Sequence, residues 1–403
     1  MRNVPQTPLS VDAYRARVAA LVPPTPVVEL PLADCLGLVL ARDVVSPVAL
    51  PPFDNSAMDG YAVRAEDVAG AGPDTPVTLP VPEDIPAGRT DVVPLAPGTA
   101  HRIMTGAPVP PGADSVVKVE DTDGGEQRVV VSAAVAAGTH IRRAGEDVAG
   151  GATVLTAGSV LGPARIGLAA AVGRAELPVH RPARVLVLST GTELVAPGNP
   201  LRHGQIYESN GTLLAAATRE LGAVPTLLRF VPDDVAAFHD AVAAHAADAD
   251  LLVTSGGVSA GAYEVVKDAL AGQGVEFLRV AIQPGGPQGC GRFGALPVVT
   301  LPGNPVSTAL SFELFVRPAL LAAMGHREAG RPRAVARTTE ELRSPAGKRQ
   351  YRRGHLDGDT VRPVGGPGSH LLASFAASDC LIEVPEGVTV VPAGEQVDVV
   401  LLH

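Results

Sequence analysis

The chain has 403 residues, of which 46% are hydrophobic and 18% charged, and its formal net charge is −10. This length is beyond what one hydrophobic core fills, so several domains are expected, and the composition excludes a disordered chain. The acidic balance disfavours a nucleic-acid-binding protein, because such proteins present a basic face to phosphates.

The N-terminal segment predicts a soluble protein. Residues 11–21 have the spacing of an amphipathic helix behind an N-cap at Ser10, which differs from a secretory signal. No uncharged apolar run approaches the roughly 18 residues that cross a bilayer. The three cysteines, Cys35, Cys290 and Cys380, form no C-x-x-C motif and fit buried thiols in a reducing compartment. We therefore expect a cytoplasmic protein without a membrane partner.

The first half of the chain predicts one domain inserted into another. Between residues 51 and 146, proline and glycine recur between short β-branched runs such as 115–119 and 128–131, which predicts a β-rich domain II. Residues 1–50 and 147–178 carry the apolar spacing of helices. These two flanks predict a discontinuous helical domain I, interrupted by domain II.

From residue 183 onward, strands alternate with helices. The predicted strands cover residues 184–188, 226–230, 250–254 and 297–301. This alternation is typical of a doubly wound α/β domain with helices on both faces of the sheet, here assigned to residues 179–327 as domain III. Residues 328–403 return to short β-type runs, which predicts a small C-terminal β-barrel, domain IV. The predicted fold class is therefore multidomain α/β.

Three polar turns follow strands of the predicted α/β domain, at residues 189–193, 254–257 and 301–305. Ligands of such sheets bind outside the carboxyl ends of the strands, where glycines admit a close backbone approach and helix N-termini attract anions. One such turn is ordinary connection chemistry, but three together favour a phosphate or a nucleotide-like ligand. No G-x-x-x-x-G-K-[ST] motif is present, which disfavours a Walker-type hydrolase. The candidate ligand-binding residues are Ser255, Gly256, Gly257, Gly303 and Asn304.

Carboxylates accompany these turns at Glu193, Asp233 and Glu264. Magnesium takes one or two protein carboxylates and bridges to phosphate oxygens, so these three residues are candidate metal ligands. An N-cap at Asp233 and solvated first-turn acids at Glu193 and Glu264 explain the same pattern. Spacing alone leaves the two interpretations balanced.

Two further kinds of segment have unusual polar content. Residues 51–62 and 102–114 are loops dense in turn residues and polar side chains, which is typical of functional loops, although Asx-turns or a proline-rich connector also explain them. Near the C-terminus, arginines around Arg353 precede Ser369, a combination that suits oxyanion recognition. A solvated basic edge strand is the commoner explanation of such a cluster.

Six motifs are long and specific: PPFDNSAMDGYA at 51–62, RIMTGAPVPPGADSVV at 102–117, GEDV at 145–148, STGTEL at 189–194, TSGGVSAG at 254–261 and LPGNPVS at 301–307. Together they resemble the molybdopterin molybdenumtransferase family, called MoeA in bacteria and represented in animals by the C-terminal region of gephyrin. The resemblance runs from about Ser10 to Leu402. It implies the four-domain layout and an elongated homodimer whose active cleft combines both subunits.

The resemblance also implies residue roles. Acidic and hydroxyl groups surround Mg²⁺ and the pyrophosphate of adenylylated molybdopterin, and a second group surrounds molybdate. Molybdate would be inserted into the pterin dithiolene with release of AMP. The adenylyltransferase that precedes this step and apo-molybdoenzymes are implied as partners. The first group is Asp59, Thr105, Asp147, Glu193 and Asp233; the second is Ser307, Arg353 and Ser369, with Arg279 nearby.

The sequence departs from the family pattern at two places. Glu264 stands where the family commonly has aspartate, and residues 283–287 read Q-P-G-G-P where the family often has K-P-G-K-P. The second change removes positive charge beside the expected oxyanion, although the Gln283 amide still offers two donors. Two alternatives follow: a paralogue with another oxyanion preference, such as tungstate, or a non-catalytic cofactor carrier or scaffold. The acids at Asp59, Glu193 and Asp233 argue against a scaffold.

Overall fold

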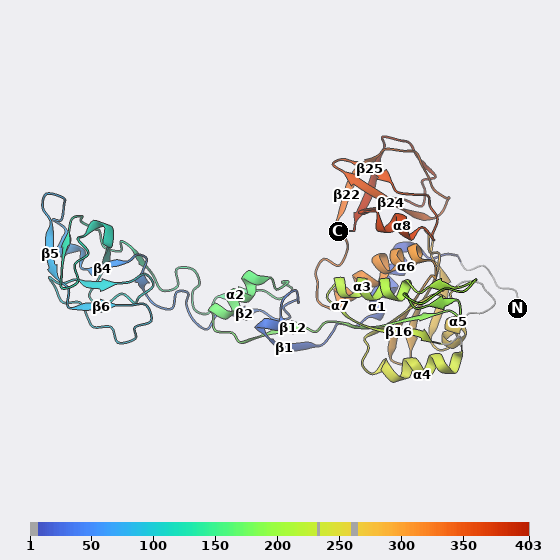
Figure 1. Ribbon diagram of the computed structural model, residues 1–403, viewed down its shortest axis with the longest axis horizontal. Helices are drawn as coiled ribbons and strands as arrows, with labels where there is room; N and C mark the ends of the chain where they lie inside the picture. The colour runs from blue at the N-terminus through green and yellow to red at the C-terminus, as the bar shows by residue number, and fades with distance from the viewer. Residues whose placement is uncertain (1–6, 232–233, 259–264, 403) are drawn as a thin grey trace.

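The structure is a computed structural model that describes residues 7–231, 234–258 and 265–402. The molecule is elongated: a β-rich lobe lies at one end, a small unit lies in the middle, and an α/β unit carrying a C-terminal β unit lies at the other end (Figure 1). Each part has its own hydrophobic core. The predicted multidomain α/β fold class is confirmed, while the domain boundaries given above stay predictions.

The β-rich lobe is built from short strands around two small cores. A four-stranded sheet has the order β6-β7-β4-β8, and two further strand pairs flank it. Gly60 is required in this sheet, since an added Cβ would lie 2.0 Å from the Val117 carbonyl oxygen. The strands are β3 (Asn55–Ser56), β4 (Gly60–Val63), β5 (Val77–Pro80), β6 (Glu83–Ile85), β7 (His101–Ile103), β8 (Ser115–Lys118), β9 (Arg128–Val131) and β10 (Ile141–Arg142), with 3-10 turns η2 (Ala65–Val68) and η3 (Val119–Asp121).

The middle unit joins segments that flank the lobe in sequence. β1 (Val27–Pro31) pairs with β12 (Glu176–His180), and β2 (Val44–Val45) pairs with β11 (Thr153–Leu155), both antiparallel. Helix α2 (Pro163–Ala171) and the 3-10 turn η1 (Leu32–Asp34) complete it. The segment that enters the lobe and the segment that leaves it therefore pair with each other in the middle unit, as expected if the lobe is an insertion.

Helix α1 (Val11–Leu21) contacts the α/β unit rather than the middle unit, in contrast to its expected place in domain I. Its buried face joins the core of the α/β unit. Tyr14 donates a hydrogen bond to the Gly289 carbonyl at 3.1 Å, and its ring meets Phe315 edge-on at 4.8 Å. Chain order alone assigned this helix to its neighbours in sequence, whereas burial assigns it to the larger apolar surface.

The α/β unit contains a six-stranded sheet of order β16-β13-β17-β21-β20-β18. The first four strands run parallel, β20 runs antiparallel to β21, and β18 runs antiparallel to β20 and thus in the same direction as the first four. Cores on both faces confirm the doubly wound arrangement. The strands are β13 (Arg184–Thr190), β16 (Val224–Val231), β17 (Leu251–Ser255), β18 (Val275–Arg279), β20 (Pro287–Phe293) and β21 (Leu296–Leu301); the helices are α3 (Asn210–Glu220), α4 (Val235–Ala246), α5 (Val265–Leu270), α6 (Pro305–Ser311), the π-helix η4 (Phe312–Val316) and α7 (Arg317–Ala323).

Residues 305–323 form one continuous helical run through α6, η4 and α7. Its 19 residues, with a mean hydropathy of 1.4, are long and apolar enough to cross a membrane, but 78% of that stretch is buried inside the protein. The run contacts α1 and α3. It is therefore a core helix of the α/β unit.

The C-terminal unit is a closed barrel, as predicted. Its strands follow the order β24-β25-β22-β28-β26, and β26 pairs back to β24. A short strand of the α/β unit, β19 (Ile282–Gln283), pairs with β24 and ties the two units together. The barrel strands are β22 (Arg333–Thr338), β24 (Arg349–Asp357), β25 (Thr360–Pro363), β26 (Cys380–Val384) and β28 (Gln396–Leu401); β23 (Leu342–Arg343), β27 (Val390–Val391) and α8 (Leu372–Ala376) accompany them.

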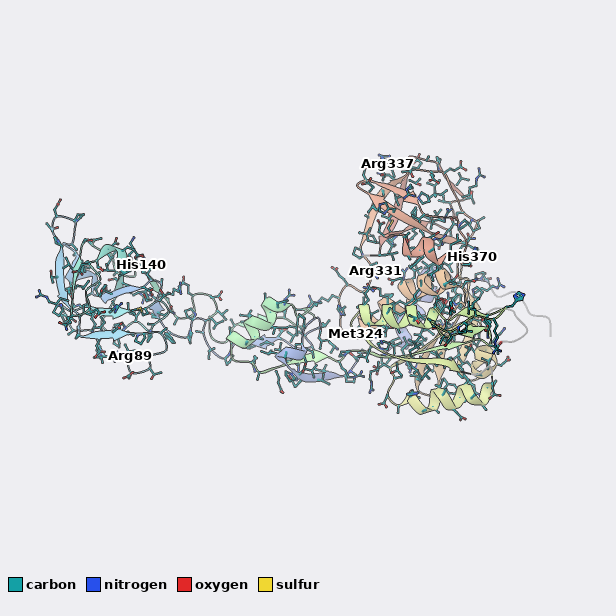
Figure 2. All side chains as sticks on the ribbon, viewed as in Figure 1. Arg89, His140, Met324, Arg331, Arg337 and His370 are labelled. Atoms are coloured by element: carbon teal, nitrogen blue, oxygen red, sulfur yellow. The ribbon has the colours of Figure 1, made fainter. Side chains whose placement is uncertain are left out.

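Two junctions connect the α/β unit to its neighbours. Figure 2 shows Arg331 where the barrel meets the α/β unit, and Arg331 donates to Glu313 and Glu220 at 2.8 Å each. Met324, after α7, lies on the side that faces the middle unit (Figure 2). There Gly325 (φ +83°) lies against His180, the last residue of β12, and an added Cβ would be 2.4 Å from its ring. This close approach and the hydrogen bond from Arg327 to the Ala157 carbonyl at 2.7 Å join the middle unit to the α/β unit.

Candidate functional site

The three predicted turns lie at the carboxyl ends of adjacent parallel strands, β13, β17 and β21. Ser189 Oγ is 3.3 Å from Ser255 Oγ, and the Gly256 N–H donates to the Leu301 carbonyl at 3.0 Å. A Cβ on Gly303 would lie 3.3 Å from Gly256 Cα. The turns thus form one continuous edge, which we call the rim: residues 189–194, 254–257 and 301–305.

Glycines shape the middle turn of the rim. Gly256 and Gly257 both adopt left-handed backbone, with φ of +88° and +66°. A side chain at Gly257 would also meet Val266 Cβ at 2.9 Å. Glycine tolerates both the left-handed conformation and the close approach. At this turn the backbone is therefore not covered by side chains of its own residues. Asn304 is exposed at the N-cap of α6, and its side chain makes no capping bond.

Of the predicted magnesium ligands, Glu193 lies at the rim and is exposed. Its carboxylate folds over Gly191, where an added Cβ would be 2.7 Å from Glu193 Oε2. Asp233 and Glu264 lie outside the described residues. Within the described part of the chain, no three His, Cys, Asp or Glu side chains are grouped as a metal site. One described carboxylate is nevertheless compatible with Mg²⁺, whose remaining ligands are waters and phosphate oxygens.

Sequence reasoning missed two polar residues directly beneath the rim. Glu208 is 1% exposed and accepts hydrogen bonds from the Gly211 N–H at 2.5 Å and from Ser189 Oγ at 3.1 Å. Asn210 donates from Nδ2 to the Gly303 carbonyl at 2.7 Å. An acid followed by Ser-Asn at the start of a helix was the available signal, and it resembles ordinary capping.

The predicted oxyanion residues converge at the N-terminus of α6. Gly285 (φ +100°) lies against this helix, and an added Cβ would be 3.4 Å from both Ser307 Cβ and Ser311 Oγ. The Val306 N–H donates to the Ser369 carbonyl at 3.1 Å. Ser307 is 2% exposed. The 283–287 loop, α6 and the barrel loop around Ser369 therefore meet beside the third turn of the rim.

Arg353 reaches this place from β24, where it is 2% exposed. Its guanidinium donates to the Gly368 carbonyl at 3.2 Å and to the Gly366 carbonyl. Burial lowers the pKa of this guanidinium from its ordinary value. The side chain thus anchors the loop that carries Ser369, a contact that the sequence did not predict.

Two buried glutamines support the 283–287 loop and were also missed. Gln350 donates to Gln283 Oε1 at 2.7 Å, which leaves the Gln283 NH₂ group with its own donors. Gln288 donates from Nε2 to the Gly285 carbonyl and to Ser311 Oγ, at 2.7 Å each. Arg279 is exposed at the end of β18, opposite Pro287. Amides rather than lysines therefore surround this loop.

A second polar cluster lies in the β-rich lobe, away from the rim along the molecule (Figure 1). Asp59 Oδ1 accepts hydrogen bonds from the Thr105 N–H at 2.6 Å and from Thr105 Oγ1 at 2.7 Å. These two bonds, the backbone one first, lower the pKa of Asp59. Asp147 is exposed on the returning segment, where its N–H donates to the Leu50 carbonyl at 3.0 Å. The structure thus joins Asp59 to Thr105 but brings neither to Glu193 in one chain.

The Thr105→Val substitution should raise the pKa of Asp59 toward its ordinary value, because one of its two donors is lost while the backbone N–H remains. Since a depressed pKa keeps a carboxylate ionised to lower pH, the variant carboxylate will accept protons at higher pH than the wild type. Carbon-detected NMR titration measures this shift. Asp123, whose pKa is lowered mainly by the Val130 N–H, serves as the internal control. An unchanged Asp59 titration would show that the hydroxyl contributes nothing.

Three family models match successive parts of the chain. The MoeA N-terminal region (domain I and II) matches residues 9–173, a probable molybdopterin binding domain matches residues 186–322, and the MoeA C-terminal region (domain IV) matches residues 335–402. The fold and the rim thus have the make-up of a multidomain molybdopterin-biosynthesis protein. The chain belongs to the MoeA family of molybdopterin molybdenumtransferases.

Individual relatives agree over almost the whole length. The chain is 55% identical to molybdopterin molybdenumtransferase 2 of Mycobacterium tuberculosis, over 97% of this chain and 98% of that protein. It is 36% identical to the molybdopterin molybdenumtransferase of Haemophilus influenzae, with the same coverage of 97% and 98%. A crystal structure of the molybdopterin biosynthesis MoeA protein from Pyrococcus horikoshii matches with a TM-score of 0.85 and 33% identity, covering 98% of this chain and 100% of that one.

Proposed function

We propose that this protein is a molybdopterin molybdenumtransferase, which inserts molybdate into adenylylated molybdopterin and releases AMP in a Mg²⁺-dependent reaction. The observation that carries the proposal is that the rim and the cluster around Ser307 and Ser369 meet at the start of α6. The glycine turns of the rim end at Gly303, and the Ser307 and Ser369 cluster begins within four residues of it. A nucleotide-bearing substrate and an oxyanion would therefore lie side by side.

The rim would bind the pyrophosphate of the substrate. Backbone N–H groups around Gly256 and Gly257 suit phosphate oxygens, since the bare turn admits them closely. Glu193 would hold Mg²⁺, with Asp233 and Glu264 proposed as further ligands from outside the described residues. The ion, when bound, would neutralise phosphate charge.

The cluster at α6 would bind molybdate. Ser307 and Ser369 would offer hydroxyls, and Gln283 would offer amide hydrogens held in place by Gln350. Arg279, which pairs with Pro287 of the 283–287 loop, would supply a formal positive charge, because Arg353 is engaged with loop carbonyls. Recognition by mainly neutral donors suits a dianion in a partly buried place, where hydrogen bonds to charged groups are strong.

The active unit would be a homodimer. Asp59 and Thr105 lie in the lobe at one end of the chain and the rim lies toward the other end (Figure 1). If both groups act on one substrate, a second copy of the chain must bring its lobe to the rim. We further propose that the enzyme acts in the cytoplasm, receives its substrate from the preceding adenylyltransferase and delivers cofactor to apo-molybdoenzymes.

The test is AMP release by purified protein given adenylylated molybdopterin, molybdate and Mg²⁺, with the product assayed by reconstitution of a cofactor-free molybdoenzyme. The proposal predicts AMP release that depends on molybdate and yields active cofactor. Binding of the adenylylated pterin without AMP release at any molybdate concentration would overturn it. Repeating the assay with tungstate separates an altered oxyanion preference from a lack of activity.

The Gly286→Lys substitution should lower the molybdate concentration for half-maximal AMP release about five- to tenfold, because it adds a positive charge beside the oxyanion. The position accepts a side chain, since an added Cβ would meet nothing closer than the Val280 carbonyl oxygen at 3.4 Å. Gly286→Ala is the matched control for backbone effects. A half-saturating concentration equal to or above that of Gly286→Ala would contradict the charge argument.

A further inference from the structure

The buried carboxylate of Glu208 connects the first two turns of the rim. It accepts from Ser189 Oγ at 3.1 Å, and Ser189 Oγ lies 3.3 Å from Ser255 Oγ. The same carboxylate accepts from the Gly211 N–H at the start of α3, at 2.5 Å. Glu208 therefore occupies the N-terminus of α3 itself, and that helix end is closed to a substrate phosphate.

Glu208 also determines which serine donates and which accepts in the hydrogen-bonded series Glu208–Ser189–Ser255. When the Glu208 carboxylate is ionised, it only accepts hydrogen bonds, and Ser189 then donates its single hydroxyl hydrogen to Glu208. The bond between the two serines is then donated by Ser255. As a result the Ser255 oxygen presents its lone pairs to the rim, whereas donors to phosphate come from the backbone of the glycine turn.

Asn210 connects the same segment to the third turn. Its Nδ2 donates to the Gly303 carbonyl at 2.7 Å, and Gly303 packs against Gly256. Its Oδ1 atom is buried and has no hydrogen-bond partner among the described residues. The amide orientation is fixed, because an oxygen facing the Gly303 carbonyl would repel it. Glu208 and Asn210, two residues apart, thus reach all three turns.

The burial of Glu208 is costly for a purely structural residue. It is 1% exposed, and the donors to its carboxylate are the neutral groups Ser189 Oγ, the Gly211 N–H and, at 3.4 Å, Thr212 Oγ1. Apolar residues at such places often stabilise a fold as well or better, and buried charges are best attested where they impose one arrangement. A carboxyl group in this place is therefore suited to fixing the turns through its hydrogen bonds to Ser189 and Gly211.

We propose that Glu208 and Asn210 are positioning residues that hold the three turns in register for the nucleotide part of the substrate. The proposal rests on the proposed function. Glu208 acts through Ser189 and Ser255, and Asn210 acts through Gly303. Neither is required to touch the substrate.

The test compares Glu208→Gln, Asn210→Ala and Ser189→Ala with wild type by calorimetric AMP binding and by steady-state AMP release. Glu208→Gln is nearly isosteric, but its amide can donate to Ser189 and reverse the hydroxyl chain. Each variant is expected to raise the Kd for AMP and the KM for adenylylated molybdopterin about tenfold, with kcat within about threefold. Ser209→Ala is the matched control, because Ser209 is the N-cap of α3 but makes no side-chain capping bond.

A double variant separates positioning from general stability. Since Glu208 acts through Ser189, Glu208→Gln combined with Ser189→Ala should be no worse than either single change, whereas independent structural losses would multiply. AMP affinity and KM within twofold of wild type in folded Glu208→Gln and Asn210→Ala, or multiplying losses in the double variant, would overturn the proposal. If Glu208→Gln does not fold, Ser189→Ala and Asn210→Ala decide the outcome alone.

The outcomes also separate this proposal from the proposed function. An active wild type with unaffected variants removes the positioning role and leaves the transferase standing. If the wild type binds AMP but releases none from the substrate, and the variants bind AMP more weakly, the transferase proposal is overturned and the positioning role stands. A wild type that neither turns over nor binds AMP overturns both.

Discussion

Mixing the inactive variants Asp59→Asn and Glu193→Gln is expected to restore about one quarter of wild-type AMP release. In a dimer whose cleft takes its lobe from one subunit and its rim from the other, each mixed dimer has one cleft with both residues intact. Half the dimers in an equal, fully exchanged mixture are mixed, and half of their clefts are active. Steady-state AMP release before and after subunit exchange measures the recovery.

The control for this experiment is a mixture of Asp59→Asn with Thr105→Val at the same concentrations. Both changes lie in the lobe, where Thr105 donates two hydrogen bonds to Asp59. Every mixed cleft then carries one damaged lobe, so activity should stay at the average of the two variants. No recovery in the first mixture, when light scattering shows dimers that exchange, would contradict a cleft shared between subunits.

Arg353→Ala should raise the molybdate concentration for half-maximal AMP release by about 30-fold. The substitution removes the donors to the Gly366 and Gly368 carbonyls, and hydrogen bonds from a charged group contribute about 1.5–3 kcal/mol each when buried. The loop that carries Ser369 then loses its anchor. AMP release over a molybdate series, with thermal unfolding followed in parallel, gives both the site effect and the stability effect.

Two variants show whether this effect is specific. Arg352→Ala changes the next residue of β24, which makes a longer bond of 3.4 Å to the Gly365 carbonyl, and is expected to shift half-saturation less than threefold. Arg353→Lys keeps the charge but loses the planar fork, so it should fall between wild type and alanine. Equal shifts in Arg352→Ala and Arg353→Ala would assign the loss to the barrel as a whole.

The sequence predicts those parts of the fold in which burial requires a recognisable run or spacing of apolar residues along the chain. The central strands β13, β17 and β21 are buried on both faces and read as continuous apolar runs. β20 was not predicted, because its sequence PQGCGRF lacks that pattern. Its glycines are explained only by tertiary contacts: a Cβ on Gly289 would lie 2.3 Å from Thr300 Oγ1.

The residues of the candidate site likewise fall into those that the sequence predicts and those that it does not. Turn residues such as Ser255 and Gly256 are predictable, because a strand end in a parallel sheet has a known place. Glu208 was missed, since its partner Ser189 is 19 residues away and Ser255 lies a further 66 residues along the chain from Ser189. Gln350 was missed for the same reason, as it meets Gln283 across 67 residues. Contacts between residues so far apart in the chain produce no local sequence pattern from which they could be predicted.

The contact between His180 and Gly325, together with the hydrogen bond from Arg327 to the Ala157 carbonyl at 2.7 Å, joins the middle unit to the α/β unit. The lobe lies at the far end of an arm whose base is this contact (Figure 1). A rotation of a few degrees at the base would translate Asp59 in proportion to the length of this arm, without unpacking the separate cores of the units. In the proposed dimer, the width of a cleft closed by the partner's lobe would therefore depend on contacts far from every residue that would touch the substrate.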